Sequence, residues 1–587
     1  MEKRGLEMSA REKYEQWRQD PRFAQTVRDE LNRIAADAKE IEDRFYQDLQ
    51  FGTAGLRGLL GAGTNRMNFY TVARAAEAYA RVLERTPENL ERGIAISYDS
   101  RNYSQEFSEL SARIFLKHGF RVYLSDRLRP VPLLSYAIRS RQTAGGIMMT
   151  ASHNPREYNG FKVYSADGSQ LEPEAAAQVA EEMAKHTNLP DLLVGLPELK
   201  APGLALTWLG EDLDQDYNDY LQTLIIDREA IAAQPDLAIV YSPLHGSGYR
   251  PVTRALESLG FRNLFIVPEQ RDPDGNFPTA TYPNPEAPEA MQLALDLAAE
   301  QDADLVIATD PDADRLGVAV REHSGNYTLL SGNEIGVLLM DYILSAKAQY
   351  LADNREHFCV TSVVSSRLPR LICAHYGVKL YECLTGFKYI AEKIREGQAA
   401  GEVYDFGFEE SYGYLIGDQV RDKDAVSAAA LVCELAAVAA CEGQTLAERC
   451  DALFRKYRYA AEKTVSLSRP GKAGLAAIAQ TVNELRSERE ELFQELRPKS
   501  RIDYHAGEIY SYADGQSSPL VDATSSNLLI YNLGQLDWFA TRPSGTEPKL
   551  KIYMGAYRST PEEADRALAA IEAVVLPTIE ARLDQKI

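Results

Sequence analysis

The chain has 587 residues, of which 45% are hydrophobic and 26% charged, which is typical of a folded globular protein and excludes wholesale disorder, collagen and a small disulfide scaffold. Single hydrophobic cores stop growing near roughly 250–300 residues, so we expect several domains, about four by length. The 64 Lys and Arg against 86 Asp and Glu give a net charge of −22. A chain this acidic repels nucleic acid and anionic lipid, and we expect neither a nucleic acid nor a membrane as a partner. An anionic substrate would have to be met by a local cluster of Arg and Lys.

The cysteines and the apolar runs predict a cytoplasmic protein. No CxxC motif and no apolar leader are present, so we expect buried thiols in a reducing compartment. The six cysteines are Cys359, Cys373, Cys383, Cys433, Cys441 and Cys450. The longest weakly polar run, Ala425–Cys441, contains Glu434 and is shorter than the ~20 residues of a membrane span. It predicts a buried helix.

In chain order, residues 10–50 predict one or two amphipathic helices. Strands then alternate with helices in three successive blocks, which predicts βαβ units and largely parallel sheets. The predicted strands are 93–98, 121–124, 146–149, 237–241, 264–267, 305–308, 360–364 and 403–406. The predicted helices are 106–118, 133–140, 252–259, 290–299, 336–344 and 368–375.

The last ~120 residues have a different pattern, since a charged helix over 476–497, polar strands, a Gly-bearing loop at 541–547 and a final helix over 561–583 predict an α+β domain. We therefore expect three related α/β domains and one C-terminal α+β domain. The expected bounds are 1–200, 201–325, 326–465 and 466–587.

The segment Thr150-Ala151-Ser152-His153-Asn154-Pro155 follows a predicted strand. Ligands bind at the carboxyl ends of parallel strands, and Asn-Pro ends this strand with the Ser152 hydroxyl in the turn. Side chains of adjacent residues point apart on an extended chain, so Ser152 and His153 do not form a catalytic triad. Taken alone, Ser152 is more often a turn-capping serine than a nucleophile.

Three aspartates follow another strand, in Asp310-Pro311-Asp312-Ala313-Asp314-Arg315. Strand alternation would bring their carboxylates together, where they repel unless a cation lies between them. All-oxygen ligands suit Mg²⁺. The segment fits an EF-hand poorly, because Arg315 and Arg321 stand where that loop needs Gly and Glu.

Two further loops carry polar groups. Gly407–Gly413 holds Glu409, Glu410 and Ser411, which suit sugar hydroxyls but equally suit a solvated acidic turn. The run Arg542–Lys551 contains Arg542, two hydroxyls and Gly545, followed by two lysines, and predicts a phosphate cradle.

Taken together and in this order, the four loops resemble those of the α-D-phosphohexomutase family, the phosphoglucomutases and phosphomannomutases. Phe51–Gly58 and Thr385-Gly386-Phe387-Lys388 are most similar to its bacterial phosphoglucomutase branch. The resemblance implies four domains around a central cleft, the last with a TATA-binding-protein-like fold. It also implies interconversion of glucose 1-phosphate and glucose 6-phosphate through a phosphoserine and a glucose 1,6-bisphosphate, which also serves as primer.

The resemblance assigns roles to single residues. Ser152 would carry the phosphoryl group, and one Mg²⁺ per chain would be held by Asp310, Asp312, Asp314 and the phosphate on Ser152. Lys162 and Lys423 match family positions suited to acid and base catalysis, and Arg57 would steady the phosphoryl group. The substrate-binding residues would be His153, Arg315, Lys388, Glu409, Ser411, Arg542, Ser544, Gly545 and Thr546. His245 either braces the metal loop or has no special role.

One departure and several alternatives stay open. The commoner family form of the third loop has Gly where this chain has Phe408, which affects the sugar preference. The alternatives are a mannose or pentose substrate, synthesis of a sugar bisphosphate, a sugar-phosphate sensor, and a metal-dependent phosphatase with Asp310 as nucleophile. The assembly is either a monomer or a homodimer.

Overall fold

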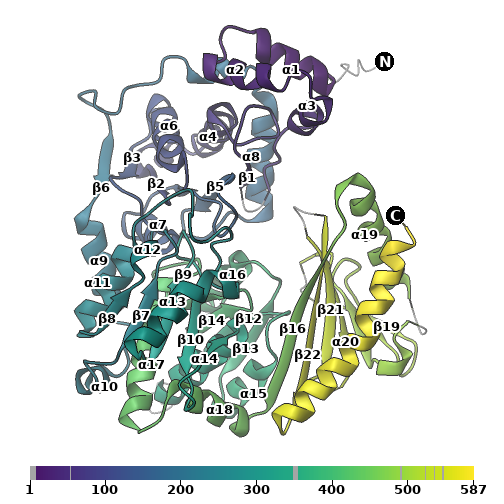
Figure 1. The fold of residues 1–587 in the computed structure, drawn as a ribbon. Coiled ribbons are helices and arrows are strands. Elements are labelled where there is room, and N and C mark those ends of the chain that lie inside the picture. The colour runs from purple at the N-terminus through teal and green to yellow at the C-terminus, as the bar shows by residue number, and fades with distance from the viewer. Residues whose placement is uncertain are drawn as a thin grey trace. The chain divides into compact units, whose positions relative to one another are not determined.

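The computed structural model describes residues 8–52, 55–347, 355–488, 492–521, 524–534, 536–544 and 548–586. The chain divides into two compact units (Figure 1). The first unit comprises Met1–Leu339 and Phe387–Leu446, and the second comprises Met340–Gly386 and Ala447–Ile587.

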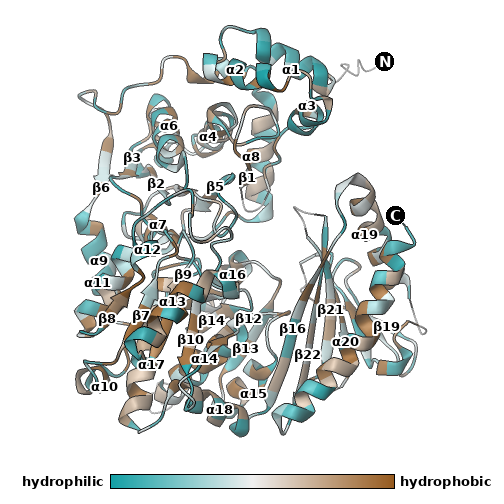
Figure 2. Ribbon diagram, viewed as in Figure 1, coloured by the Kyte–Doolittle hydropathy of each residue, from teal (hydrophilic) through white to brown (hydrophobic). Residues whose placement is uncertain are grey.

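Three helices, α1 (Ala10–Gln19), α2 (Gln25–Arg33) and α3 (Ala38–Phe45), begin the first unit. The sequence predicted one or two. The number is three because Pro21 follows the end of α1 and the Asp37 carboxylate caps the start of α3. Figure 2 shows α1 and α2 mostly in the hydrophilic colour, and their apolar residues lie inward in a small aromatic cluster.

The first sheet has six strands in the order β1-β5-β4-β2-β3-β6. They are β1 (Leu56–Leu59), β2 (Ile94–Tyr98), β3 (Val122–Ser125), β4 (Gly145–Met149), β5 (Tyr158–Ser165) and β6 (Leu206–Leu209). The strands β2, β3, β4 and β6 are parallel, as predicted. The strand β5 is antiparallel to both β4 and β1, and it was not predicted.

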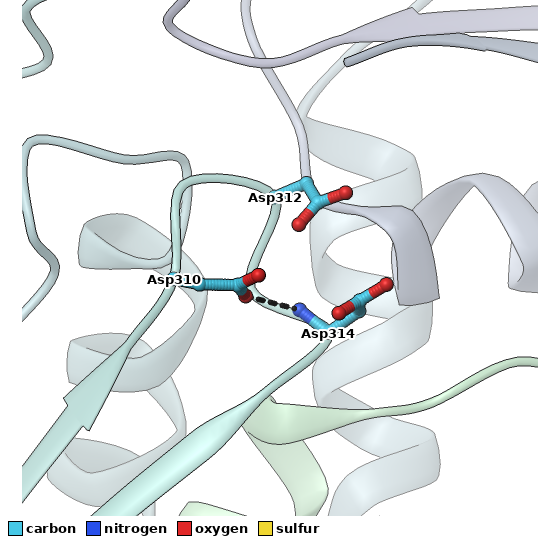
Figure 3. Close-up of side chains that lie close together, drawn as sticks. All are labelled: Asp310, Asp312 and Asp314. Carbon is cyan, nitrogen blue, oxygen red and sulfur yellow. Dashed lines mark hydrogen bonds between the residues drawn. The ribbon is translucent and has the colours of Figure 1, made fainter. Parts of the chain in front are cut away.

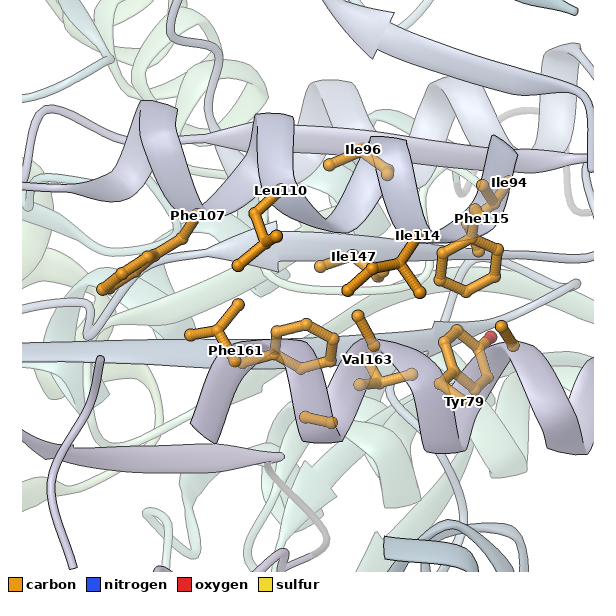
Figure 4. Packing of buried hydrophobic residues seen from close by; sticks show 14 of the residues in the cluster. Tyr79, Ile94, Ile96, Phe107, Leu110, Ile114, Phe115, Ile147, Phe161 and Val163 are labelled. Atoms are coloured by element: carbon orange, nitrogen blue, oxygen red, sulfur yellow. The ribbon is translucent and has the colours of Figure 1, made fainter. Parts of the chain in front are cut away.

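Helices cover both faces of this sheet. The helices are α4 (Phe69–Leu83), α5 (Glu88–Arg92), α6 (Ser104–Lys117), α7 (Val131–Ser140) and α8 (Pro173–Lys185). Figure 4 shows side chains of α6, among them Phe107 and Ile114, pointing toward Phe161 of β5. On the other face α7 packs against Met148 and Tyr164. Each buried side chain of this size contributes about 1.5–3 kcal/mol, and together they fix the register of β4 and β5.

The second sheet has five strands in the order β11-β10-β9-β7-β8. They are β7 (Ile239–Ser242), β8 (Leu264–Ile266), β9 (Leu305–Thr309), β10 (Leu316–Arg321) and β11 (Tyr327–Leu330). The strands β7, β8 and β9 are parallel and β10 returns antiparallel to β9. The accompanying helices are α9 (Glu211–Gln222), α10 (Arg228–Ala233), α11 (Tyr249–Leu259), α12 (Pro268–Arg271) and α13 (Pro288–Gln301).

The rest of the first unit is built on the antiparallel pair β14 (Val403–Glu409) and β15 (Gly413–Ile416). The helix α17 (Ala425–Cys441) is buried along most of its length, as predicted, and Figure 2 shows it mostly in the hydrophobic colours. Among the described residues no single helix is long and apolar enough to cross a membrane, although α17 and α18 (Leu446–Lys456) pass such a test as a bent pair.

The second unit contains the parallel strands β12 (His357–Ser362) and β13 (Lys379–Cys383), joined by α15 (Leu368–Tyr376). It also contains a sheet in the order β16-β22-β21-β20-β17-β18-β19, in which all neighbours are antiparallel. These strands are β16 (Tyr459–Ser468), β17 (Ser500–Asp503), β18 (Glu508–Ser511), β19 (Ser517–Pro519), β20 (Leu529–Asn532), β21 (Trp538–Pro543) and β22 (Lys549–Arg558).

Two helices, α19 (Gly471–Ser487) and α20 (Pro561–Asp584), bury their apolar residues against this sheet. The predicted final helix is thus present. The predicted helix over 476–497 begins and ends too far along the chain, since α19 runs over Gly471–Ser487. The chain is already extended at Glu488, and Phe493 is buried in the core of this sheet. The expected domain boundary at residue 465 falls inside β16.

None of the six cysteines, all of which lie in the described ranges, is in a disulfide. Five are buried, as predicted, but Cys441 is exposed because it is the last residue of α17.

Candidate active site

The serine loop, residues Thr150–Tyr158, connects β4 to β5 in the first unit. Ser152 is buried, with a φ of +54°, in a region that residues other than glycine rarely occupy. Its backbone N–H donates to Thr150 Oγ1 at 2.8 Å. No side chain fits at Gly160, where a Cβ would lie 2.4 Å from the Thr150 carbonyl oxygen. Contacts with the rest of the unit therefore hold Ser152 in a strained turn.

Arg101, which the sequence analysis missed, holds this loop together. Its guanidinium donates to the carbonyl oxygens of Ser152 and Asn154, and at 3.0 and 3.1 Å to those of Pro155 and Tyr158. The Asp99 carboxylate lies 3.4 Å from Arg101 Nε. The available signal was a charged Asp-Ser-Arg run directly after the predicted strand 93–98.

The metal loop, residues Asp310–Arg315, follows β9 in the second sheet of the same unit. Asp310, Asp312 and Asp314 are all buried, and one carboxylate oxygen from each lies within 4.8 Å of the other two. Figure 3 shows the three side chains converging, with the Asp314 N–H donating to Asp310 Oδ1 at 3.1 Å. Strand alternation was expected to bring the carboxylates together, and that reason was wrong. The strand β9 ends at Thr309, and a turn with Ala313 at a φ of +45° brings them together instead.

The two loops meet through side-chain hydrogen bonds. Ser152 Oγ donates to Asp310 Oδ2 at 2.9 Å, and Thr150 Oγ1 donates to Asp312 Oδ2 at 3.1 Å. The predicted nucleophile and the predicted metal ligands are therefore brought together from two sheets.

The metal loop is fixed from several sides by its backbone. Val131 N–H, at the start of α7, donates to the Asp312 carbonyl at 3.0 Å. Ser247 donates to the Pro311 carbonyl through both its N–H and its Oγ, each at 2.8 Å. His245 instead lies 2.8 Å from Thr279 Oγ1, so its neighbour Ser247 is the residue that braces the metal loop.

Two lysines neutralise the carboxylates. Lys162 Nζ donates to Asp312 Oδ2 at 2.8 Å and to Asp314 Oδ2 at 3.3 Å. Lys423 Nζ lies 3.1 Å from Asp314 Oδ2. Burial opposes their charge, but the carboxylates outweigh it and raise the pKa of both lysines. A lysine acts as a base near neutral pH only when its pKa is lowered, and the shift of both lysines is in the opposite direction.

The carboxylates themselves are shifted in opposite directions. Burial, followed by the charges of Asp312 and Asp314, raises the pKa of Asp310 well above its ordinary value. Burial also acts to raise the pKa of Asp314, but Lys423 and Lys162 outweigh it and hold that pKa far below its ordinary value. The three carboxylates therefore repel one another strongly, and the two lysines compensate only part of their negative charge.

The donor set of this cluster fits a divalent cation. Asp312 Oδ1 and Asp314 Oδ1 are buried and have no hydrogen-bond partner among the described residues. A buried carboxylate oxygen without a partner is costly. Three converging carboxylates supply the hard oxygen ligands that Mg²⁺ prefers. These residues can therefore hold a metal ion.

The other residues expected beside the serine are also near it. His153 Nδ1 lies 3.2 Å from Ser152 Oγ, and burial, followed by the charges of Arg315 and Arg57, lowers the pKa of His153 well below its ordinary value. Arg57, on β1, donates to Asn154 Oδ1 at 3.1 Å. Arg315 Nε lies 3.9 Å from Asp310 Oδ2.

The third loop is the turn Glu410–Tyr412 between β14 and β15. Glu409 is buried at the end of β14 and Ser411 is half-buried in the turn. Phe408 is buried against Gly336 of α14 (Gly332–Lys347), where a Cβ would lie 2.4 Å from its ring. The phenylalanine that departs from the common family form therefore belongs to the core.

Lys388 is half-buried in the first turn of α16 (Phe387–Ala399). Its Nζ lies 4.8 Å from the centre of the Tyr389 ring. Burial lowers the pKa of Lys388 to about 8. No contact between Lys388 and the carboxylate cluster is found among the described residues.

The predicted phosphate loop lies in the second unit. Arg542, on β21, is paired with Lys551 of β22, and Ser544 N–H donates to the Lys549 carbonyl at 2.8 Å. Gly545 and Thr546 lie outside the described residues.

Three domains of the phosphoglucomutase/phosphomannomutase family match the chain: alpha/beta/alpha domain I over residues 48–190, domain II over 215–325 and domain III over 331–457. The phosphoglucomutase of Staphylococcus aureus strain MRSA252 is 36% identical over 519 residues, covering 88% of this chain and 91% of that protein.

Solved structures show the same fold at lower identity. The open form of pp63/parafusin, a phosphoglucomutase from Paramecium, has a TM-score of 0.69 at 18% identity and covers 92% of this chain and 96% of its own. A phosphoglucomutase/phosphomannomutase family protein from Burkholderia thailandensis has a TM-score of 0.63 at 18% identity, covering 91% and 97%. The matched domains and the identity to the staphylococcal protein confirm the resemblance seen in the motifs: this chain belongs to the phosphoglucomutase/phosphomannomutase family.

Proposed function

We propose that this protein is a phosphoglucomutase, which interconverts glucose 1-phosphate and glucose 6-phosphate. One observation carries the proposal: Ser152 Oγ lies 2.9 Å from Asp310 Oδ2, within a cluster of three buried carboxylates. The staphylococcal relative that covers most of the chain is named phosphoglucomutase. A phosphatase with Asp310 as nucleophile would leave the buried, strained Ser152 without a role, so the contact favours the mutase.

In the proposed reaction, Ser152 carries a phosphoryl group. A hydroxyl oxygen of the sugar phosphate forms a new bond to phosphorus while the bond between phosphorus and Ser152 Oγ breaks, and the product is glucose 1,6-bisphosphate. The sugar hydroxyl loses a proton and the serine oxygen gains one. The bisphosphate then reverses its orientation and returns its other phosphoryl group to Ser152. A trace of the bisphosphate primes the unphosphorylated enzyme.

Positive charge around Ser152 supports this transfer. Lys162 and Lys423, within 3.3 Å of Asp314, are the proposed acid and base groups. Arg57, which holds Asn154 of the serine loop, is proposed to steady the phosphoryl group. We assign one Mg²⁺ per chain to Asp310, Asp312, Asp314 and the phosphate on Ser152. When bound, the ion neutralises charge on the transferring group.

The proposed substrate contacts come from the remaining loops. In the first unit they are His153, Arg315, Lys388, Glu409 and Ser411. In the second unit, Arg542, Ser544, Gly545 and Thr546 are proposed to hold the phosphate that is not being transferred, because an arginine beside hydroxyls and a glycine forms a phosphate cradle. The four proposed domains remain 1–200, 201–325, 326–465 and 466–587, although the boundary at residue 465 falls inside β16 (Tyr459–Ser468).

A cytoplasmic location and a sugar phosphate as the small-molecule partner complete the proposal. Six cysteines without a disulfide among them fit a reducing compartment. Glucose is proposed first, with mannose or a pentose as the alternative sugar.

Mass spectrometry and a coupled assay test the function. Intact wild-type protein should carry one phosphate, located on Ser152 by peptide mapping. The Ser152→Ala variant should fold and lose turnover, while Ser324→Ala, in an exposed turn, should keep both phosphate and activity. Glucose, mannose and ribose 1-phosphates are compared with Mg²⁺ and the matching bisphosphate. Full activity of a phosphate-free enzyme without bisphosphate would refute the mechanism, and release of inorganic phosphate as the main product would identify a phosphatase.

A further inference from the structure

An exposed tyrosine lies against the serine loop. The ring of Tyr282 packs edge-on to His153, with ring centres 5.4 Å apart, and His153 Nδ1 is 3.2 Å from Ser152 Oγ. The Tyr282 side chain is nevertheless 44% exposed. A large ring beside a reactive group that keeps this much surface open is available for contact with a ligand.

The segment that carries Tyr282 is anchored at two points, one on the residues that hold the serine loop and one on the loop itself. At one end Phe277 is buried under Arg101, whose guanidinium carbon lies 4.9 Å from the ring centre. Asn102 Nδ2 donates to Asn276 Oδ1 at 3.2 Å. At the other end Tyr282 meets His153. Residues 276–282 therefore extend from Arg101, which holds the serine loop, to His153 within that loop.

The backbone around Tyr282 has little freedom. Pro283 and Pro285 are buried, and the residue before a proline is restricted to extended conformations. The buried Asn284 donates from its N–H to the Tyr282 carbonyl at 2.8 Å and from Nδ2 to the Tyr282 hydroxyl at 3.4 Å. The ring is thus held in place although much of its surface is open.

His153 connects Tyr282 to the reacting groups. Ser152 Oγ lies 3.2 Å from His153 Nδ1 and donates to Asp310 Oδ2 at 2.9 Å. Tyr282 therefore lies against the loop that brings Ser152 to the carboxylates.

The geometry points to Tyr282 as a substrate-contacting residue, whose open ring receives the apolar C–H face of the sugar while the phosphoryl group meets Ser152. This inference rests on the proposed function and adds a specificity-determining contact to it. Sugar rings present C–H groups on one face, and an aromatic ring offers them an apolar surface without competing for the hydroxyls. Inorganic phosphate has no such face and gains nothing from the ring.

Binding measurements separate the sugar contact from the phosphate contact. In a Ser152→Ala background, where no turnover occurs, Tyr282→Ala should raise the Kd of glucose 1-phosphate roughly fivefold to tenfold, as expected for one lost ring contact. The Kd of inorganic phosphate should stay unchanged. Tyr282→Phe should bind both probes as the parent does. Tyr46→Ala, which removes another exposed tyrosine (53%, against 44% for Tyr282) at the end of α3, is the matched control.

Kinetics on the otherwise wild-type enzyme complete the test. Tyr282→Ala should raise KM more than it lowers kcat. An unchanged Kd for glucose 1-phosphate overturns the inference. Equal weakening of glucose 1-phosphate and inorganic phosphate, or a loss confined to kcat, also overturns it, because Tyr282 would then act by positioning His153. If the wild type binds glucose 1-phosphate but does not isomerise it, the proposed function fails while the contact is still tested.

Discussion

Lys162 Nζ lies 2.8 Å from Asp312 Oδ2, although 150 residues separate the two in the chain. The lysine is on the antiparallel strand β5 of the first sheet, and the aspartate is in the turn after β9 of the second sheet. This ion pair ties the serine loop, which leads into β5, to the metal loop. Its partners are both buried, so each depends on the other for its charge to be tolerated.

Replacing Lys162 by Met should remove this tie. We expect kcat to fall by about 10²–10⁴, the range for a positioned proton-transfer group. Without added metal, the free energy of unfolding should fall by about 3–5 kcal/mol, because carboxylates are left buried and unpaired. Steady-state kinetics and urea unfolding measure both effects. The exposed Lys200→Met is the control, and unchanged kcat in Lys162→Met would remove this lysine from the proposed machinery.

Asp312→Asn should weaken divalent-cation binding. The amide offers one neutral oxygen in place of a charged carboxylate and keeps the side-chain volume, so the loss is electrostatic. Isothermal titration with Mg²⁺ and Mn²⁺ should show at least about a tenfold rise in Kd, in line with loss of one charged ligand. Asp302→Asn, at the exposed end of α13, should bind as the wild type does. Equal affinity of the two variants would exclude the carboxylate cluster as the metal site.

Arg101→Lys should loosen the serine loop. One ammonium cannot replace a planar guanidinium that donates to four carbonyl oxygens. We expect a free energy of unfolding lower by about 1–3 kcal/mol, faster amide hydrogen exchange within residues 150–158, and lower kcat. Exchange followed by mass spectrometry checks the location, with the exposed Arg121→Lys as control. Faster exchange confined to some other part of the chain would contradict the role of Arg101 in holding the serine loop.

His118→Gln should make stability less dependent on pH. His118 lies 2.9 Å from Glu77 and 2.7 Å from Glu84. The hydrogen bond that the His118 ring donates to Glu77 raises the pKa of His118 above its ordinary 6.5, although burial opposes this. Burial alone would raise the pKa of Glu77, but His118 lowers it to about 2.

These two pKa shifts determine how the free energy of unfolding changes with pH. The histidine's contribution to stability is complete below pH 6.5 and is lost as the pH rises through its raised folded-state pKa. The contribution of Glu77 is present above its ordinary 4.5 and is lost as the pH falls toward about 2. Between about pH 4.5 and 6.5, the free energy of unfolding of the wild type should therefore exceed that of His118→Gln by about 1–3 kcal/mol. This difference should disappear at alkaline pH. Urea unfolding at several pH values, with the exposed His505→Gln as reference, measures this difference in the free energy of unfolding. A difference that grows as the pH rises would contradict the prediction.

Phe408→Gly, which restores the commoner family residue, should change stability and not sugar preference. The ring fills the space above Gly336, so its removal should lower the free energy of unfolding by about 3–5 kcal/mol. The ratio of kcat/KM for glucose 1-phosphate to that for mannose 1-phosphate should stay the same. A shifted ratio would return Phe408 to the determinants of sugar preference.

Much of the first unit could be predicted because its parallel strands are short apolar runs bounded by turn residues. The Ser152 and Asp310 loops were found for the same reason, since each directly follows such a strand. By contrast β5 alternates polar and apolar residues and returns antiparallel, so the pattern of parallel blocks did not reveal it or explain how Lys162 reaches Asp312. Arg101 was missed because its role depends on carbonyl oxygens some fifty residues away, which no local pattern contains.

Helices could also be predicted from the sequence, but not always the residues at which they end. Helical spacing predicted α6 and α20 closely, because their apolar faces meet a sheet. It failed at the end of α19, where charged residues favour a helix but Phe493 is drawn into the core.

The antiparallel return of β5 has an evolutionary consequence. Phe161 and Val163 face one side of the sheet and enter the core, and the intervening Lys162 faces the other side. Sliding this strand by a single position would bury the ammonium among hydrocarbons and turn the aromatic ring toward the carboxylate cluster. Selection for a well-packed interior therefore also preserves the alignment of a proposed catalytic group. Insertions between Ser152 and Lys162 should survive only where the extra residue bulges out before the strand begins.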